Sequence, residues 1–211
     1  TIVNISVTMI CAYPLTRREL PFRGLIMFLF TFTMFFGGGL IASYLNISNL
    51  HMINTFWVMI LPGAMSVYNM IITRTFFQNG VPHELLEASQ IDGCSDARYF
   101  VSILLPLSQA VISVISLYYA VAHWNSYFSA MIYFKTRDKL PLANILRELL
   151  ILSLTPELER SLSAEVQATM EKRAEVMKYS LIVVASLPMM ILYPFIQKYF
   201  VRGVMIGAVK G

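Results

Sequence analysis

The 211-residue sequence is poor in charge. Charged residues make up 13% of the chain, whereas hydrophobic residues make up 57% and the mean hydropathy is +0.64. Soluble domains carry roughly 25% charged residues, so about half of the usual surface charge is missing. The composition therefore argues against a soluble domain and favours the lipid bilayer as the solvent of this chain.

Cysteine is also scarce, and two cysteines cannot form a disulfide framework. Cys11 lies in an apolar stretch and Cys94 in a polar one, without the Cys-x-x-Cys spacing typical of metal sites. The formal net charge of +4 comes from Arg and Lys beside apolar segments, not from a basic stripe. We therefore expect no metal, no cofactor and no nucleic-acid partner.

Ionisable side chains are nearly absent from the apolar segments. No carboxylate lies between Leu25 and Thr73 or between Phe100 and Phe134, and His123 is the one clear ionisable group. Carriers coupled to protons or sodium usually need buried carboxylates, so a secondary carrier is disfavoured. Without paired carboxylates, metal ligands or a Ser-His-Asp set, we expect no catalytic residues either.

Long apolar segments are what the chain has instead. Crossing about 30 Å of hydrocarbon takes about 20 helical residues. The last four segments are long enough, and we interpret the shorter first one as trimmed or incompletely represented. The five segments lie at about residues 1–16, 24–45, 53–73, 103–131 and 179–197.

Prolines and glycines interrupt several of these segments. Such breaks are tolerated where neighbouring helices or a cavity satisfy the freed backbone groups. They indicate either close helix packing through small residues or hinge points of a moving pore. The interruptions are Pro62, Pro106, Pro188, Pro194 and the run Gly37–Gly39.

Basic residues beside the segments predict the orientation, because short cytoplasmic loops are enriched in Lys and Arg. Segment 135–178 has eight such residues, but seven acidic ones nearly balance them and long loops weigh less in the rule. We expect loop 74–102 and the C-terminus to be cytoplasmic and segment 135–178 to be extracytoplasmic. The residues that support this are Arg17, Arg18, Arg23, Arg74, Arg98, Lys198, Arg202 and Lys210.

Loop 74–102 predicts a short helix, a sharp turn and a second helix. Glu84 and Glu87 lie in early turns of the short helix, where the helix dipole favours acidic side chains. Gly93 suits the left-handed C-terminal cap of that helix. Ser95 is a candidate N-cap for the helix that enters the next span.

This loop closely resembles the EAA loop of ABC importer permeases, which reads E-A-A-x-x-D-G-A with nine residues between the Gly and I-x-L-P. Residues 87–94 read EASQIDGC, residues 94–102 are those nine, and residues 103–106 read ILLP. Ser89 and Cys94 replace two alanines with other small residues. In the family this helix docks in a cleft of a cytoplasmic ATPase. The resemblance therefore implies a coupling role for Glu84, Glu87, Ala88, Ser89, Asp92 and Gly93.

The resemblance covers essentially the whole chain. It is strongest to carbohydrate importer permeases of the maltose-permease type, in the subgroup that moves complex oligosaccharides. It implies an all-α membrane protein with the type I ABC importer transmembrane fold, as a single domain over residues 1–211 with about five of six expected spans. The sequence has no G-x-x-x-x-G-K-[ST] phosphate loop, so the chain is not the ATPase. The stretches that carry the likeness are AYPLTRRELPFRG, FTMFFGGGLI, WVMILPGAMSVYNMII, AVAHWNSYFSAMIY and YPFIQKYFVRGVMIGAVKG.

Aromatic and amide side chains near the spans supply the chemistry of a sugar site. Tyr118 and Asn125 are seven residues apart and so share a helical face. The alternative is an aromatic belt at the outer interface together with helix-packing hydrogen bonds, which we favour for Trp124 and Tyr127. His123 is interpreted as a packed or interfacial histidine. The expected substrate path comprises Tyr44, Asn69, Tyr118, Tyr119 and Asn125.

The outer segment 135–178 is long for a connection. Residues 140–151 have helical periodicity, and residues 165–180 are expected to form a solvated helix leading into the last span. By resemblance, this segment contacts an extracytoplasmic sugar-binding protein. The alternative is a surface lid that packs on its own helical bundle. The apolar side of the first helix is Leu142, Ile145, Leu146 and Leu149.

The expected function is that of a permease subunit of an ATP-driven, binding-protein-dependent importer that moves an oligosaccharide into the cytoplasm. Alternatives are an ABC importer permease for a non-sugar solute and an ATP-independent secondary carrier. The resemblance implies a multi-pass protein of the bacterial inner membrane that is not itself an enzyme. Its implied partners are a second homologous permease, two ATP-binding cassette ATPase subunits and a solute-binding protein, besides membrane lipid.

Overall fold

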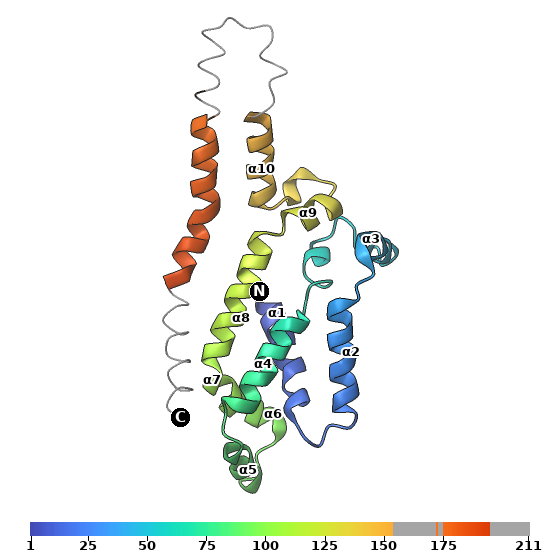
Figure 1. The fold of residues 1–211 in the computed structure, drawn as a ribbon, viewed down its shortest axis with the longest axis vertical. Coiled ribbons are helices and arrows are strands. Elements are labelled where there is room, and N and C mark those ends of the chain that lie inside the picture. The colour runs from blue at the N-terminus through green and yellow to red at the C-terminus, as the bar shows by residue number, and fades with distance from the viewer. Residues whose placement is uncertain (154–171, 173–174, 195–211) are drawn as a thin grey trace, which may run out of the picture. The chain divides into compact units, whose positions relative to one another are not determined.

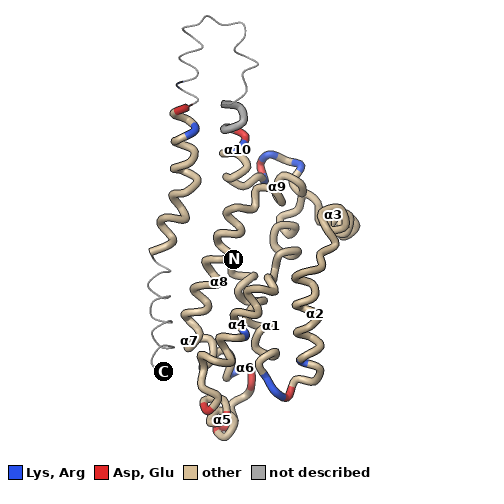
Figure 2. Tube along the Cα trace, viewed as in Figure 1, with Lys and Arg blue, Asp and Glu red and all other residues tan. Residues whose placement is uncertain are grey.

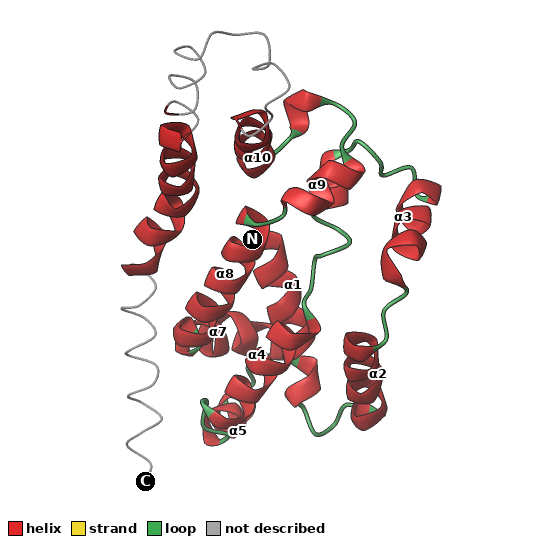
Figure 3. Ribbon diagram, turned by 45° about the horizontal axis from the view of Figure 1, so that its top comes forward, coloured by secondary structure: helices red, strands yellow, loops and turns green. Residues whose placement is uncertain are grey.

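The structure, a computed structural model, describes residues 1–153, 172 and 175–194 (Figure 1). These residues form helices joined by loops, without a strand among them, so the all-α prediction is confirmed for this part of the chain (Figure 3). The chain divides into two compact units, whose described parts are residues 1–120 and 121–194.

The first unit contains most of the helices. They are α1 (Ile2–Ala12), α2 (Arg23–Phe35), α3 (Gly39–Asn49), α4 (Val67–Asn79), α5 (Glu84–Ile91), α6 (Asp96–Tyr99), a π-helical turn (Phe100–Leu104), α7 (Leu105–Leu107) and most of α8 (Gln109–Trp124). Short 3-10 turns follow α1 at Pro14–Thr16 and α3 at Phe56–Met59.

The second unit begins in the last turn of α8. It contains α9 (Tyr127–Tyr133), a 3-10 turn (Arg137–Lys139), α10 (Leu142–Ser153) and a helix over Glu175–Pro194. The helix expected at 140–151 is therefore confirmed as α10. The helix expected at 165–180 lies partly outside the described residues, and its end coincides with the start of Glu175–Pro194.

The helix Glu175–Pro194 is 20 residues long, and it is the one described helix both long and apolar enough to cross a bilayer. Pro188 does not interrupt it. Two further pairs of helices meet the same test together but are strongly bent, α2 with α3 by 111° and Asp96–Leu107 with α8 by 80°. Counting each bent pair as one span gives three spans among the described residues.

The bend between α2 and α3 occurs at the glycine run. Helix α2 ends at Phe35, and α3 starts at Gly39, whose φ of +77° is one that side chains with a Cβ rarely adopt. A Cβ added at Gly37 or Gly39 would meet nothing within 4 Å. The glycines therefore serve a break in the backbone rather than a close approach of two helices.

The apolar segment 53–73 is not one helix. Its first part forms the 3-10 turn Phe56–Met59 and further turns, and α4 begins only at Val67. Ser66 caps α4 by accepting a hydrogen bond from the backbone N–H of Asn69 at 3.4 Å. The prediction of a span over the whole segment was wrong for its first half, where Pro62 and Gly63 disfavour helix.

The helix that enters the apolar segment 103–131 begins at Asp96, as the predicted N-cap at Ser95 implies, and it bends within the segment. Pro106 has no N–H to donate and its ring crowds the preceding turn, which accounts for the π-helical turn Phe100–Leu104 just before it. The Ser108 hydroxyl donates to the Leu104 carbonyl at 2.7 Å, so this carbonyl has a partner at the bend.

Helices α1, α4 and α8 share the core of the first unit, where Met9, Met70 and Ile115 are almost fully buried. A polar cluster crosses this core at Tyr119. Its hydroxyl lies 2.6 Å from the Thr8 hydroxyl and accepts the backbone N–H of Ser66 at 2.9 Å. This one phenol thus connects α8 to α1 and to the cap of α4.

We predict that Tyr119→Phe destabilises the protein, because it leaves the Ser66 N–H and the Thr8 hydroxyl without their partner. The expected loss is about 1–2 kcal/mol of unfolding free energy. It is measured by SDS titration of the purified protein in mixed micelles. Tyr118→Phe is the matched control, since Tyr118 is 45% exposed on the same helix. Equal effects of the two substitutions would contradict the role given to Tyr119.

Candidate coupling site and substrate path

Helix α5 is a short, separate helix between α4 and α6. Helix α4 stops at Asn79, and an added Cβ at the next residue, Gly80, would lie 2.9 Å from the Phe76 carbonyl oxygen. Helix α5 then starts at Glu84 with both Glu84 and Glu87 in its first turn, as predicted. These carboxylates lie near the positive end of the helix dipole, where a negative charge is stabilising.

The turn after α5 is a Schellman motif centred on Gly93. The backbone N–H of Cys94 bonds the Ser89 carbonyl at 2.9 Å, and that of Gly93 bonds the Gln90 carbonyl at 3.0 Å. Gly93 has a φ of +71°. The left-handed cap predicted from the sequence is therefore confirmed.

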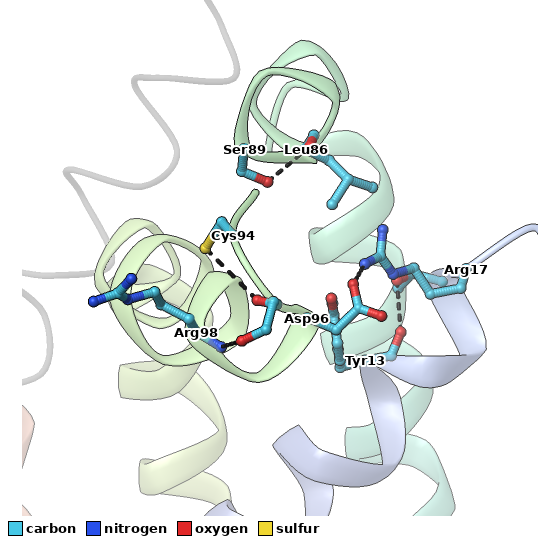
Figure 4. Close-up of polar contacts among 9 residues, drawn as sticks. Tyr13, Arg17, Leu86, Ser89, Cys94, Asp96 and Arg98 are labelled. Atoms are coloured by element: carbon cyan, nitrogen blue, oxygen red, sulfur yellow. Dashed lines mark hydrogen bonds and ion pairs between the residues drawn. The ribbon is translucent and has the colours of Figure 1, made fainter. Parts of the chain in front are cut away.

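Helix α6 begins directly after this turn. Ser95 caps it by accepting the backbone N–H of Arg98 at 3.4 Å, which confirms the predicted N-cap (Figure 4). From α6 the helical path continues through the π-helical turn and α7 to the bend before α8. Helix α5 is therefore joined to α8 by one tight turn and a helical path that bends by 80° just before α8.

Helix α5 has one buried and one exposed side. Leu86 and Ser89 are buried, and the Ser89 hydroxyl donates to the Leu86 carbonyl at 2.7 Å. On the other side Ile91 is 86% exposed, an unusual position for a large apolar side chain. The remaining residues predicted to contact an ATPase are all exposed: Glu84, Glu87, Ala88, Asp92 and Gly93.

Glu87 keeps most of its surface in solvent. Its carboxylate lies 3.8 Å from the His83 imidazole, and both side chains are more than half exposed. An exposed pair at this distance contributes little to stability. The carboxylate is therefore available to a partner protein.

A second connection joins this region to the segment between α1 and α2, residues 13–22, here called the elbow. Arg17 in the elbow pairs with Asp96 at the start of α6 (Figure 4). The Arg17 side chain is only 11% exposed, and its guanidinium lies 5.2 Å from the ring centre of Tyr13 and 5.9 Å from that of Tyr99. Desolvated cation–π contacts of this kind hold an arginine in a fixed position.

The elbow is also tied to α4. The Arg74 side chain donates through Nε to the Leu15 carbonyl at 2.9 Å. In Figure 2 the charged residues of the described part of the first unit gather mainly at the elbow and around α5 and α6, whereas α3 and α8 carry none. From the sequence, Arg17 and Arg74 indicated only the orientation of the chain. Their contacts join residues that are 79 and 59 positions apart, so no short sequence pattern predicts them.

The residues predicted for the substrate path differ in accessibility. Tyr118 is 45% exposed, Asn125 is exposed and Tyr44 is half-buried. Asn69 and Tyr119 are 5% and 4% exposed, and the Tyr119 hydroxyl already has two hydrogen-bond partners. Within the described chain, Tyr119 therefore holds helices together, while Tyr118 and Asn125 have free surface.

Metal chemistry finds no support in the described residues. No group of three or more His, Cys, Asp or Glu side chains lies close enough there to hold a metal ion. Cys11 and Cys94 both remain free thiols.

Bent apolar helices with an exposed short helix between them, and no strand among the described residues, are typical of membrane permeases. More specifically, the chain belongs to the family described as "Binding-protein-dependent transport system inner membrane component", whose sequence profile matches residues 4–206. It is thus an inner-membrane permease component of a transport system and is not itself catalytic.

Two curated relatives come from Bacillus subtilis (strain 168). The "Polygalacturonan/rhamnogalacturonan transport system permease protein YtcP" is 40% identical over 211 residues, which are all of this chain and 72% of the relative. "Protein LplC" is 41% identical over 214 residues, covering all of this chain and 70% of the relative.

A solved structure has the same fold. It is the crystal structure of a bacterial ABC transporter involved in the import of the acidic polysaccharide alginate. The TM-score is 0.81 at 25% sequence identity, and the match covers 95% of this chain and 70% of that chain. The predicted family, the helical importer-permease fold and the role as an importer permease are therefore confirmed, whereas the predicted number of about five spans stays a prediction.

We predict a measurable coupling between Arg17 and Asp96. In a double-mutant cycle with Arg17→Met and Asp96→Asn, the interaction free energy should be about 1 kcal/mol, since one partner is buried and the other exposed. The cycle is measured by SDS titration and removes the separate effect of Asp96 on the α6 N-terminus. Strictly additive single substitutions would mean that the pair does not stabilise the elbow.

Proposed function

We propose that this permease carries an oligosaccharide into the cytoplasm and is driven by a separate ATPase that docks on α5. The substrate class is supported by the two similar proteins that are named for polysaccharide import, one for polygalacturonan and rhamnogalacturonan and one for alginate. The observation that carries the docking role is the exposed side of α5, with its carboxylates and the exposed Ile91.

The chemistry of that side suits a partner cleft. Glu84 and Glu87 offer charge-assisted hydrogen bonds, while Ile91 and Leu85 offer apolar surface that gains by leaving water. Ser89 faces inward, so we assign it to packing α5 against its own chain rather than to contact with the ATPase. Ala88 leaves the backbone of α5 open to close approach.

Movement of α5 would reach the spans by two routes. The first is the Schellman turn at Gly93, which leads into α6 and on to α8. The second is the Arg17–Asp96 pair, which leads to the elbow and so to α1 and α2. Both routes start from the C-terminal end of α5, so movement of that end would be passed to α8 and to the elbow together.

The remaining partners follow from membership of a binding-protein-dependent family. We propose a second homologous permease, two ATPase subunits on the cytoplasmic side and a solute-binding protein at segment 135–178. We also propose a cytoplasmic C-terminus, which the positive-inside rule supports. For the substrate path we retain Tyr44, Asn69, Tyr118, Tyr119 and Asn125, with direct sugar contact from Tyr118 and Asn125 and a supporting role for the buried Asn69 and Tyr119.

The turn at Gly93 gives the sharpest test of this function. The complete importer, reconstituted in vesicles, should take up a labelled oligosaccharide when ATP is present. Gly93→Val should reduce uptake and substrate-stimulated ATP hydrolysis at least tenfold, because a β-branched residue is strongly disfavoured at positive φ. Nothing lies within 4 Å of an added Cβ, so strain in the backbone and not a clash would be the cause.

Gly93→Asn is the matched control, since Asn tolerates the left-handed conformation, and it should retain most of the activity. Insertion of each variant is checked by its amount in the membrane. If the Gly93→Val importer kept wild-type rates of uptake and ATP hydrolysis, this loop would have no coupling role. A wild-type importer that moves none of a panel of oligosaccharides would remove the sugar assignment.

The topology gives an independent prediction. In a background with Cys11→Ser and Cys94→Ser, a cysteine introduced by Glu87→Cys should react only with a reagent applied from the cytoplasm. One introduced by Asp138→Cys should react only from outside. An impermeant maleimide applied to intact cells and to inverted vesicles measures both. The reverse pattern would place α5 out of reach of any cytoplasmic ATPase.

A further inference from the structure

The second unit contains a cavity of about 450 Å³ between the end of α8, α10 and the helix Glu175–Pro194. Its volume lies in the usual range for small-molecule sites. Most of its wall is apolar, from residues such as Leu146, Leu181 and Met189. The groups in the wall that can recognise a ligand are Trp124, Asn125, Tyr127, Arg147, Lys178 and Ser186.

Two cations line this cavity, and no carboxylate lines it among the described residues. Arg147 lies with its guanidinium 5.3 Å from the ring centre of Tyr127, and Nη1 is 3.2 Å from the Met131 sulfur. Among the described residues neither Arg147 nor Lys178 has an ion pair. The carboxylate next in sequence, Glu148, is paired with Arg137 at 3.1 Å. An anionic ligand would supply the missing counter-charge.

The Trp124 side chain and the Tyr127 backbone are held by hydrogen bonds. The indole N–H of Trp124 donates to the Ala185 carbonyl at 2.9 Å, which fixes the ring against the helix Glu175–Pro194. The Tyr127 carbonyl accepts the Asn144 amide at 2.9 Å, which ties α9 to α10. The fixed Trp124 ring offers an apolar face for a sugar ring, and Arg147 and Lys178 lie in the wall of the same cavity.

Hydrogen-bonding groups complete the wall. The Asn125 side chain donates to the Val121 carbonyl at 3.0 Å and the Ser186 hydroxyl to the Ile182 carbonyl at 2.9 Å. Both side chains keep an oxygen that can accept further hydrogen bonds. Sugar hydroxyls can donate hydrogen bonds to these oxygens.

We propose that this cavity is a subsite for an acidic sugar unit, in which Arg147 and Lys178 bind the carboxylate and Trp124 contacts the sugar ring. The inference rests on the proposed transport of an oligosaccharide and adds that the transported chain is anionic. A guanidinium is the group best suited to a carboxylate, because its planar N–H donors match the two oxygens. Trp124 and Tyr127 also gain a role in binding. From the sequence alone, both were interpreted as residues of an aromatic belt at the membrane interface.

The test is protection of a cysteine inside the cavity. In the assembled importer with Cys11→Ser and Cys94→Ser, Ser186→Cys is alkylated in the presence of increasing trigalacturonate, and the modified peptide is quantified by mass spectrometry. Trigalacturonate should protect this cysteine. Arg147→Gln/Lys178→Gln should raise the half-protecting concentration about tenfold, the loss expected for charge-assisted hydrogen bonds. Fully methyl-esterified trigalacturonate should protect weakly and equally in both proteins.

Lys135→Gln/Lys172→Gln is the matched control, because it removes the same charge from residues that do not line the cavity. The control should leave protection unchanged. An equal loss of protection in the control would overturn the subsite. The positive charge of the protein would then attract the anion from a distance, without a specific contact in the cavity. Protection by phosphatidylglycerol but not by trigalacturonate would also overturn it, in favour of a lipid headgroup.

Uptake separates this proposal from the function on which it rests. An importer that moves neutral oligosaccharides but not trigalacturonate would overturn the acidic subsite and leave oligosaccharide transport standing. An importer that moves no oligosaccharide would overturn both. Uptake of trigalacturonate that falls in Arg147→Gln/Lys178→Gln, with assembly intact, supports the subsite.

Discussion

A break in a membrane-spanning helix has to satisfy its backbone groups without help from water, and few polar side chains are available for this in the apolar segments of this chain. The structure meets this constraint with a small number of local contacts. Ser66 caps α4, Ser108 bonds the Leu104 carbonyl beside Pro106, and the Tyr119 hydroxyl accepts the Ser66 N–H across the core. The bends they permit determine where α5 and the elbow come to lie.

The features that the sequence predicted well are local ones. Gly93 and Ser95 were assigned correctly because a helix cap depends on a few consecutive residues. The segment 53–66 was assigned wrongly, because apolar content does not distinguish a membrane-spanning helix from a series of turns in the same solvent. Pro62 and Gly63 were visible, but a proline also occurs inside the continuous helix Glu175–Pro194, so neither residue type decides the matter alone.

The candidate site was predictable only in part, for a geometric reason. Residue type identifies both Tyr118 and Tyr119 as candidates for the substrate path. Neighbouring residues of a helix, however, point in directions about 100° apart. One is therefore exposed and the other is buried and hydrogen-bonded. The pairing of Arg17 with Asp96 spans 79 residues and depends on the packing of the elbow against α6, which no short pattern records.

The π-helical turn Phe100–Leu104 has a consequence for the register of the whole path from α5 to α8. Such a turn holds one residue more than an α-helical turn, and in an α-helix one residue corresponds to a rotation of about 100°. Removing a residue there would leave α8 in place yet rotate α6 and α5 by roughly a quarter turn about the helix axis. Asp96 would no longer face the elbow, and Ile91 would point in a different direction. The length of this five-residue turn thus sets the direction in which α5 presents its exposed side.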